Sequence, residues 1–348
     1  MESQIKNNTW IKTIVVLLTC CLVFIGIFCC TDTKMADILL SVQKAGWAAL
    51  VAVLGLMFGQ LIVQSFSWQI LLKGTGYNIN FSTICSSIFV GWSANFLTPS
   101  MYLGGEPVRA YILTKDECPI SFSDALGSVF VHKFLEFAAF MFLILVSAVL
   151  VFVQFRKFLP IKISLAIVLC VSLLFLLLLG LFYSLAYKKR FFSWLIQFFG
   201  YFSIVKKWLE PYKAKINQME EFIINSFHRS LRPTGISFLG MFFFEFLIFL
   251  RPLLFFIFFQ RVLSFGELAL IFLFLQLIQA LQFTPGGIGI LEGGTIGIMS
   301  MIGISPSDAL CFATFCRIGD IAIVSLGFSL AAYFGLNQNF FKQASYHD

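Results

Sequence analysis

The chain has 348 residues, of which 59% are hydrophobic and only 12% charged, and its mean hydropathy is +0.92. These values exclude an ordinary water-soluble domain and predict an all-α polytopic membrane protein with a single membrane domain, residues 1–348. The formal net charge of +7 comes from basic residues in loops between apolar segments, so it reflects membrane topology and not nucleic-acid binding. The nine cysteines lack zinc-type spacing, and we expect free thiols, with no metal and no cofactor.

Residues 1–80 are expected to form two N-terminal helices. Residues 11–30 supply roughly the ~20 apolar residues that a membrane span needs, and we interpret them as an uncleaved span that starts on a face called side A. Residues 31–44 connect on the opposite face, side B, and residues 47–72 return to side A. Gln60, Gln64 and Trp68 recur every four residues on this span, so this stripe should face protein or a water-filled cavity.

Residues 81–187 are interpreted as the first of two repeats. Residues 81–97 are apolar but stop at Thr98-Pro99, and residues 101–113 carry Glu106 and Arg109. Because broken backbone at membrane depth needs protein or a cavity around it, we favour a re-entrant hairpin that opens on side A. Two ordinary short spans remain the alternative. Ser123 should cap a long helix to about residue 155, and residues 161–187 should cross back.

Basic residues gather in residues 188–232, where we expect an interfacial amphipathic helix and then a water-facing helix. The second repeat, residues 233–335, begins with a span at 235–259 that carries Glu245 and Arg251. A second hairpin follows at residues 267–301, with a glycine-rich break in its middle. Ser305 or Ser307 should cap the last span, and residues 336–348 form a tail.

The two repeats share four features in the same order. Thr98-Pro99 and Glu106 recur as Thr284-Pro285 and Glu292, Ser123-Asp124-Ala125-Leu126 recurs as Ser307-Asp308-Ala309-Leu310, and Lys133/Glu136 recurs as Arg317/Asp320. Such a recurrence indicates an internal duplication. Counting spans, the second hairpin opens on side B, so we expect about six full transmembrane helices plus two re-entrant hairpins in an inverted repeat. Lysine and arginine are more frequent on side A, which predicts that both termini are cytoplasmic in a cell (inner) membrane.

Charged residues inside membrane segments are the candidate functional residues, because an ionised side chain there costs at least ~2.5–3.5 kcal/mol unless it is paired or hydrated. The candidates for substrate binding and translocation are Glu106, Arg109, Lys133, Glu136, Glu292, Arg317 and Asp320, with Thr98, Pro99, Thr284, Pro285, Gly286 and Gly287 at the two breaks. Gln60, Gln64, Glu245 and Arg251 form a secondary polar stripe.

Two pairing schemes fit the repeated charges. Lys133/Glu136 and Arg317/Asp320 are each three residues apart and pair within one helix, or Lys133 pairs with Asp320 and Arg317 with Glu136 across the repeats. The pairs either only hold the two halves in register or line a shared cavity at the membrane midplane, where duplicated transporter halves usually meet.

Three local features also leave alternatives open. Arg109 suits a phosphate partner, or it is an interface residue whose charge reaches toward water. Gly286 and Gly287 free backbone N–H groups for an anion, or they serve close helix packing. His132 could shuttle protons, but a hydrogen-bonded structural histidine is favoured.

The stretches Phe96-Leu97-Thr98-Pro99, Gly105-Glu106-Pro107-Val108-Arg109-Ala110-Tyr111, Lys133-x-x-Glu136 and Thr284 to Gly293 resemble the flippase-like transmembrane domain of lysylphosphatidylglycerol synthases. The resemblance covers essentially the whole chain. The chain is similar to stand-alone members of the family, which lack the synthase domain. The family usually has arginine and aspartate where this chain has Lys133 and Glu136. The resemblance implies lipid translocation and not lipid aminoacylation.

We therefore expect a lipid transporter that moves a polar-headed lipid between leaflets. The lipid is a phospholipid or a glycolipid, and an aminoacylated head group is one of the options. No catalytic motif is present, and we expect no enzyme activity. The alternative is a membrane-embedded enzyme that acts on a polyprenyl-phosphate or glycolipid with Glu106 or Glu292 as base. The expected partners are a membrane lipid and the bilayer, with no nucleic acid, while a homo-oligomer, a lipid-modifying enzyme partner and an accessory role stay open.

Overall fold

The computed structural model describes residues 35–98, 104–118, 120–155, 168–169, 171–177, 180, 213–228, 230–280, 285–287 and 289–334. Four helices in this part of the chain are long and apolar enough to cross a membrane. They are α2 (Met35–Gly74), α5 (Phe122–Phe155), α10 (Leu231–Phe256) and α13 (Pro306–Tyr333). The predicted helical multi-pass membrane protein is confirmed. The spans predicted at 11–30 and, for the most part, at 161–187 lie outside the described residues, so the total of about six stays a prediction.

Helix α2 contains a break at Gly46, where φ is 71° and ψ is 173°. Only glycine adopts such a positive φ without a steric cost, and the break separates a short helix from the span that follows. This agrees with the predicted connection at residues 31–44 and the predicted span from residue 47. The Trp47 side chain directly after the break is 83% exposed.

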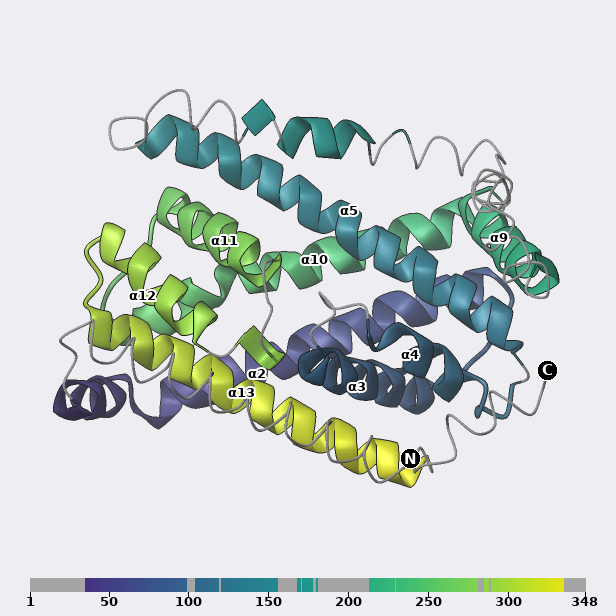
Figure 1. The fold of residues 1–348 in the computed structure, drawn as a ribbon, viewed down its shortest axis with the longest axis horizontal. Coiled ribbons are helices and arrows are strands. Elements are labelled where there is room, and N and C mark those ends of the chain that lie inside the picture. The colour runs from purple at the N-terminus through teal and green to yellow at the C-terminus, as the bar shows by residue number, and fades with distance from the viewer. Residues whose placement is uncertain are drawn as a thin grey trace, which may run out of the picture.

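Each predicted hairpin is a pair of shorter helices. The first consists of α3 (Phe81–Leu97) and α4 (Glu106–Leu113), and the second of α11 (Phe265–Ala280) and α12 (Ile290–Met301), with the 3₁₀ turn η3 (Pro285–Gly287) in its break. Helix α3 ends at the predicted residue. It approaches the start of α4 so closely that a Cβ atom added at Gly105 would overlap the carbonyl oxygen of Gly91. Figure 1 shows α3 and α4 toward one end of the long helices, and α11 and α12 toward the other.

The outer end of the first hairpin is held together by Asp116, in the loop after α4. Its Oδ2 atom accepts hydrogen bonds from the backbone N–H of Asn80, at 3.2 Å, and from the Thr83 hydroxyl, at 2.6 Å. The start of α3 and the end of α4 therefore lie at the same end of the molecule, which is the end predicted as side A.

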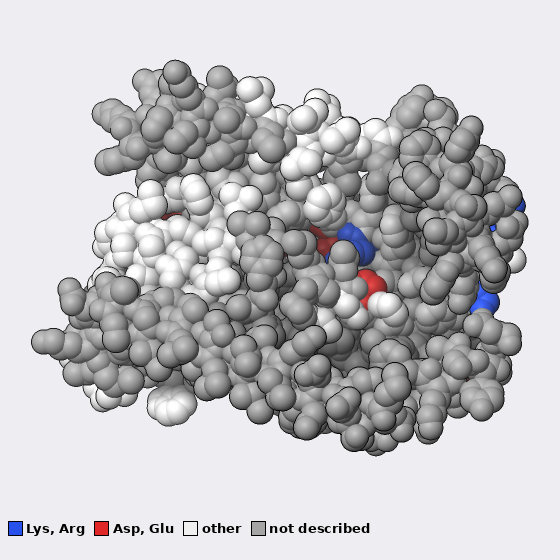
Figure 2. Space-filling view, viewed as in Figure 1, with Lys and Arg blue, Asp and Glu red and all other residues white. Residues whose placement is uncertain are grey.

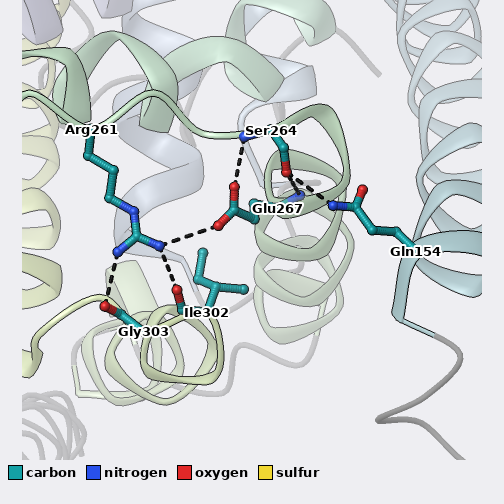
Figure 3. A network of polar contacts seen from close by, with 6 residues as sticks. All are labelled: Gln154, Arg261, Ser264, Glu267, Ile302 and Gly303. Atoms are coloured by element: carbon teal, nitrogen blue, oxygen red, sulfur yellow. Dashed lines mark hydrogen bonds and ion pairs between the residues drawn. The ribbon is translucent and has the colours of Figure 1, made fainter.

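The outer end of the second hairpin is joined in a corresponding way by Arg261, in the loop before α11 (Figure 3). Its guanidinium donates to the carbonyl oxygens of Ile302, at 2.5 Å, and Gly303, at 3.0 Å, and pairs with Glu267 at 3.3 Å. Ser264 beside it accepts from Gln154, near the end of α5, at 3.2 Å. The described end of α5 and the loops around Arg261 and Gly303 thus lie at the same end of the molecule.

Helices α2 and α10 pack against each other in antiparallel order at the centre of the molecule. Ser230, just before α10, donates to the Gly74 carbonyl at 2.6 Å, and Ser67 donates to the Ser237 carbonyl at 2.7 Å. Helix α13 packs on α2 and α3, while α5 packs on α10 and α11. Exchanging α2, α3, α4 and α5 for α10, α11, α12 and α13 leaves this set of contacts unchanged.

The predicted cap of α5 is wrong. Ser123 lies inside the first turn, and the hydroxyl of Ser121 accepts the N–H of Asp124 at 3.0 Å, because the helix starts two residues earlier than expected. For α13, the structure selects one of the two predicted caps: Ser305 accepts the N–H of Asp308 at 3.1 Å.

Helix α9 (Lys213–His228) is the described part of the basic region 188–232, and it packs against α5. Phe222, Ile223 and Phe227 are buried on one face, whereas Gln218, Glu221 and Asn225 on the other face are exposed. The prediction of a water-facing helix therefore holds for only one side of α9. The predicted amphipathic helix before it lies outside the described residues.

Candidate polar translocation site

The charged residues of the first half meet between α4 and α5. Lys133 Nζ lies 2.8 Å from Glu136 Oε1 and 3.8 Å from Glu106 Oε1. Glu106 is the first residue of α4, where a negative charge is favoured by the helix dipole. The second oxygen of Glu136 accepts a hydrogen bond from Gln64 on α2 at 3.0 Å. One lysine thus serves two carboxylates, and α2 supplies an amide.

The charged residues of the second half meet between α12 and α13. Arg317 Nε lies 2.5 Å from Glu292 Oε1, and Arg317 Nη1 lies 3.7 Å from Asp320 Oδ2 and donates to the Gly286 carbonyl. The other Glu292 oxygen accepts the Gly289 N–H at 2.7 Å, which caps α12. Arg317 therefore ties the broken backbone of the hairpin to the last long helix.

Helices α2 and α10 connect the two groups of charges. Arg251 on α10 donates to Gln60 Oε1 at 2.6 Å, and Gln60 lies one helical turn from Gln64. Asp320 on α13 lies within electrostatic range of Arg251, without an ion pair within 4.0 Å between these two described side chains. We call the resulting set the polar belt; its members are Glu106, Lys133, Glu136, Gln64, Gln60, Arg251, Glu245, Asp320, Arg317 and Glu292.

The polar belt is mostly shielded, and among its ion-paired side chains it is most exposed at Lys133. The Lys133 side chain is 26% exposed, whereas that of Glu292 is 6% exposed. Figure 2 shows acidic and basic side chains together near the middle of one face, among uncharged side chains and away from the basic groups at the edge.

Of the two pairing schemes for the repeated charges, the structure shows the one in which each pair forms within a single helix. Lys133 pairs with Glu136, and Arg317 pairs with Asp320, each within its own helix. The contact of each base with the hairpin acid of its own half, Glu106 or Glu292, was not foreseen, since it depends on how the hairpin packs on the following helix.

Arg109 is deeply buried, with 3% of its surface exposed. Its guanidinium carbon lies 4.5 Å from the ring centre of Trp68, and Nη2 lies 3.2 Å from Nδ1 of His132. The alternative of an interface residue reaching toward water is therefore wrong, because the packing of α4 on α3 and α5 covers the side chain. The structural interpretation of His132 is confirmed, since this ring also stacks on Trp68 with centroids 5.6 Å apart.

The glycines of the second break serve close packing at one point where the two hairpins meet. Gly286 has φ +61°, and a Cβ atom there would lie 2.5 Å from Cζ of Phe96, near the end of α3. The tips of the hairpins thus touch. Gly289 also has a positive φ, of 85°, and its N–H is already taken by Glu292.

The remaining predicted residues are partly described. Thr98 is exposed at the end of α3, and its hydroxyl donates to the Ala94 carbonyl at 2.9 Å. Gly287 is buried in η3. Pro99 and Thr284 lie outside the described residues, as does the side chain of Pro285.

Comparison with known proteins identifies relatives over most of the chain. The model of the family described as the lysylphosphatidylglycerol synthase TM region matches residues 10–327. A UPF0104 membrane protein of Methanothermobacter thermautotrophicus is 25% identical over 306 residues, which are 85% of this chain and 88% of that protein. A UPF0104 membrane protein of Methanocaldococcus jannaschii is 38% identical over 82 residues, covering 23% of this chain and 24% of the relative. Another, of Pyrococcus horikoshii, is 28% identical over 76 residues, covering 22% and 23%.

Proposed function

Because the chain belongs to the family of the lysylphosphatidylglycerol synthase transmembrane region, we propose that it is a lipid transporter of the flippase type. A polar-headed lipid moves between leaflets, its head group passes along the polar belt, and its acyl chains stay in the bilayer. The phosphoryl or sugar head group would otherwise have to cross the hydrocarbon core without polar partners, which is costly.

The continuity of the polar belt is the observation that carries this proposal. It runs from Glu106 at the first hairpin, through the amides of α2, to Glu292 at the second. Buried ion pairs are poor stabilisers, since apolar residues of similar volume often hold a protein together equally well. The eight ionisable groups of the belt are therefore better explained by a polar substrate than by ion pairs that only align the helices.

We further propose that the two halves form an inverted repeat with re-entrant hairpins. Three observations support it: the exchangeable helix contacts, the joining of each hairpin at its outer end, and the placement of the hairpins toward opposite ends of the long helices (Figure 1). In this arrangement each hairpin reaches the midplane from its own side, so a head group entering from either leaflet meets one set of charges. Both termini then lie on the cytoplasmic side of a cell membrane.

The chemistry of the belt suits a head group with charges of both signs. Lys133 is the most exposed base and suits a phosphate as a point charge, while the carboxylates of Glu106 and Glu136 beside it suit an ammonium group. A zwitterionic or aminoacylated lipid therefore fits as well as an anionic one. We propose no catalytic role, because Glu106 and Glu292, the candidate bases, are each engaged by a basic side chain.

The proposal is tested with purified protein in liposomes that contain fluorescently labelled phospholipids. We expect lipid movement that protein-free liposomes lack, and a loss of at least about tenfold for Arg317→Ala and Glu292→Ala, corresponding to roughly 1.4 kcal/mol of lost stabilisation. Arg109→Ala should slow lipid movement to a similar extent, because it removes the positive charge of the guanidinium that lies beside the belt. Arg261→Ala is the matched control, since Arg261 forms an ion pair outside the belt. Unchanged lipid movement in Arg317→Ala, Glu292→Ala and Arg109→Ala alike would exclude the proposed path.

A further inference from the structure

The buried charges of the membrane part do not balance. Among the described charged residues that lie away from the outer ends of the long helices and hairpins, the acids are Glu106, Glu136, Glu245, Glu292 and Asp320, and the bases are Arg109, Lys133, Arg251 and Arg317. His132 adds no charge while Nδ1 accepts from Arg109. The set therefore contains one carboxyl group more than it has cations.

Glu245 on α10 is the carboxyl group without a cation. The other four acids each pair with Lys133 or Arg317 within 4.0 Å. Glu245 is 5% exposed, and its Oε2 atom has no hydrogen-bond partner in the described part of the chain. An ionised carboxylate in that position would be an uncompensated buried charge, which typically costs several kcal/mol.

A second unsatisfied buried atom lies on α2, the helix that packs along α10. The two helices run antiparallel, with Ser67 bonded to Ser237, so Gln64 is level with Gly240 and Glu245 lies five residues further along α10. Gln64 and Glu245 are related through Glu136, which accepts a hydrogen bond from Gln64 and lies within electrostatic range of Glu245.

Gln64 lacks a hydrogen-bond donor at its oxygen. Its Nε2 group donates to Glu136, which requires a donor, and this fixes the orientation of the amide. Gln64 Oε1 is then left buried as an acceptor with no partner in the described residues. A protonated carboxyl among these groups would be neutral and would supply an O–H donor.

We propose that Glu245 is a proton-binding site at the centre of the polar belt, and that the proton bound there couples lipid movement to the proton gradient. The charged groups that face Glu245 are Lys133 and Glu136 from α5 and Arg251 from its own helix, while α2 faces it with amides. Water that reaches the belt from one side of the membrane supplies the proton as hydronium, and a neutral water molecule remains. The proton is later released to water on the other side. With the proton bound, the four remaining carboxylates balance the three bases of the belt and Arg109 beside it, and a head group of mixed charge can move through the belt.

The coupling rests on the proposed function, whereas the presence of the proton does not, so the two are measured separately. The infrared band of a protonated carboxyl is recorded at neutral pH for the purified protein, for Glu245→Gln and for Glu267→Gln. Glu267 is the matched control, because it pairs with Arg261 outside the belt. We expect Glu245→Gln to lose one carboxyl's share of the band and Glu267→Gln to keep it. Equal spectra for Glu245→Gln and the wild type would overturn the proton site.

The second measurement is lipid movement in liposomes as a function of pH and of an imposed proton gradient. Wild-type movement should slow with rising pH, by up to about tenfold per unit once Glu245 releases its proton, and should respond to the gradient. Glu245→Gln imitates the protonated acid and should move lipid with neither dependence. Movement that is insensitive to both in the wild type would overturn the coupling alone, and wild-type liposomes without any movement would overturn the proposed function while the infrared result stands.

Discussion

The pair formed by Arg317 and Glu292 allows a quantitative test of how the second hairpin is held. Replacing Arg317 by Met removes a charge 2.5 Å from a carboxylate that is 6% exposed, and it also removes the donor to the Gly286 carbonyl. Breaking a buried ion pair by deleting one partner costs about 3–5 kcal/mol, because the other charge stays buried without compensation. We expect Arg317→Met to lower the free energy of unfolding by about this amount.

The double variant separates the ion pair from simple loss of packing. Glu292→Gln keeps an oxygen that can accept the Gly289 N–H and removes the charge. In the combination with Arg317→Met the Glu292 charge is no longer left behind and only the more distant Asp320, 3.7 Å from Arg317, loses its partner, so the loss should be smaller than the sum of the single losses by about 1–3 kcal/mol. Arg261→Met, whose side chain is 33% exposed, should cost less than Arg317→Met because water replaces the lost contacts.

The assay is equilibrium unfolding of the purified protein in mild detergent, titrated with a denaturing detergent and followed by tryptophan fluorescence. The same titration is run for the wild type, both single variants and the double variant. Losses that add up within about 0.5 kcal/mol would refute the reasoning, since they would show that Arg317 and Glu292 contribute independently.

Three further predictions concern local structure. Gly105→Ala should lower thermal stability in detergent, because the added Cβ would overlap the α3 backbone, whereas Gly55→Ala, with open space around its Cβ position, should not. Burial and a hydrogen bond to a carboxylate raise the pKa of Tyr77, in the loop before α3, to about 12. Tyr77→Phe should therefore remove one late-titrating phenol from the ultraviolet titration. The free energy of unfolding of the wild type should fall as the pH rises from about 10 to about 12, and Tyr77→Phe should lack this contribution. Ser305→Ala should cost about 1 kcal/mol by removing the cap of α13, and Ser307→Ala clearly less, in the same unfolding titration.

Features that depend on short stretches of sequence were predictable. The end of α3 follows from Thr98-Pro99, since proline lacks the N–H that would continue a helix, and α3 ends at Leu97. The pairing of Lys133 with Glu136 follows from their spacing on one helix face. The polar stripe of α2 was predicted to face protein, and Gln60 and Gln64 are both 3% exposed.

Features that depend on packing between distant segments were not predictable. The cation–π contact of Arg109 with Trp68 joins α4 to α2, and no spacing in the chain indicates it. The joining of the hairpin ends by Asp116 and Arg261 depends equally on loops that meet only in the folded protein. The cap of α5 was misplaced because Ser121 and Ser123 both suit an N-cap, and only the actual start of the helix distinguishes them.

The most direct test of the wet polar belt compares two neighbouring positions on α13 in the membrane. Single cysteines are introduced as Asp320→Cys and Ile321→Cys in protein without native cysteines, and a charged, membrane-impermeant thiol reagent is applied to liposomes. Ile321 is 61% exposed and the Asp320 side chain 15%, so exposed area alone would favour position 321. We predict the reverse order, because a thiol reacts as the thiolate, which forms in a hydrated belt and not against hydrocarbon. Faster labelling at position 321, or no labelling at position 320 from either side of the membrane, would contradict a water-accessible path for the head group.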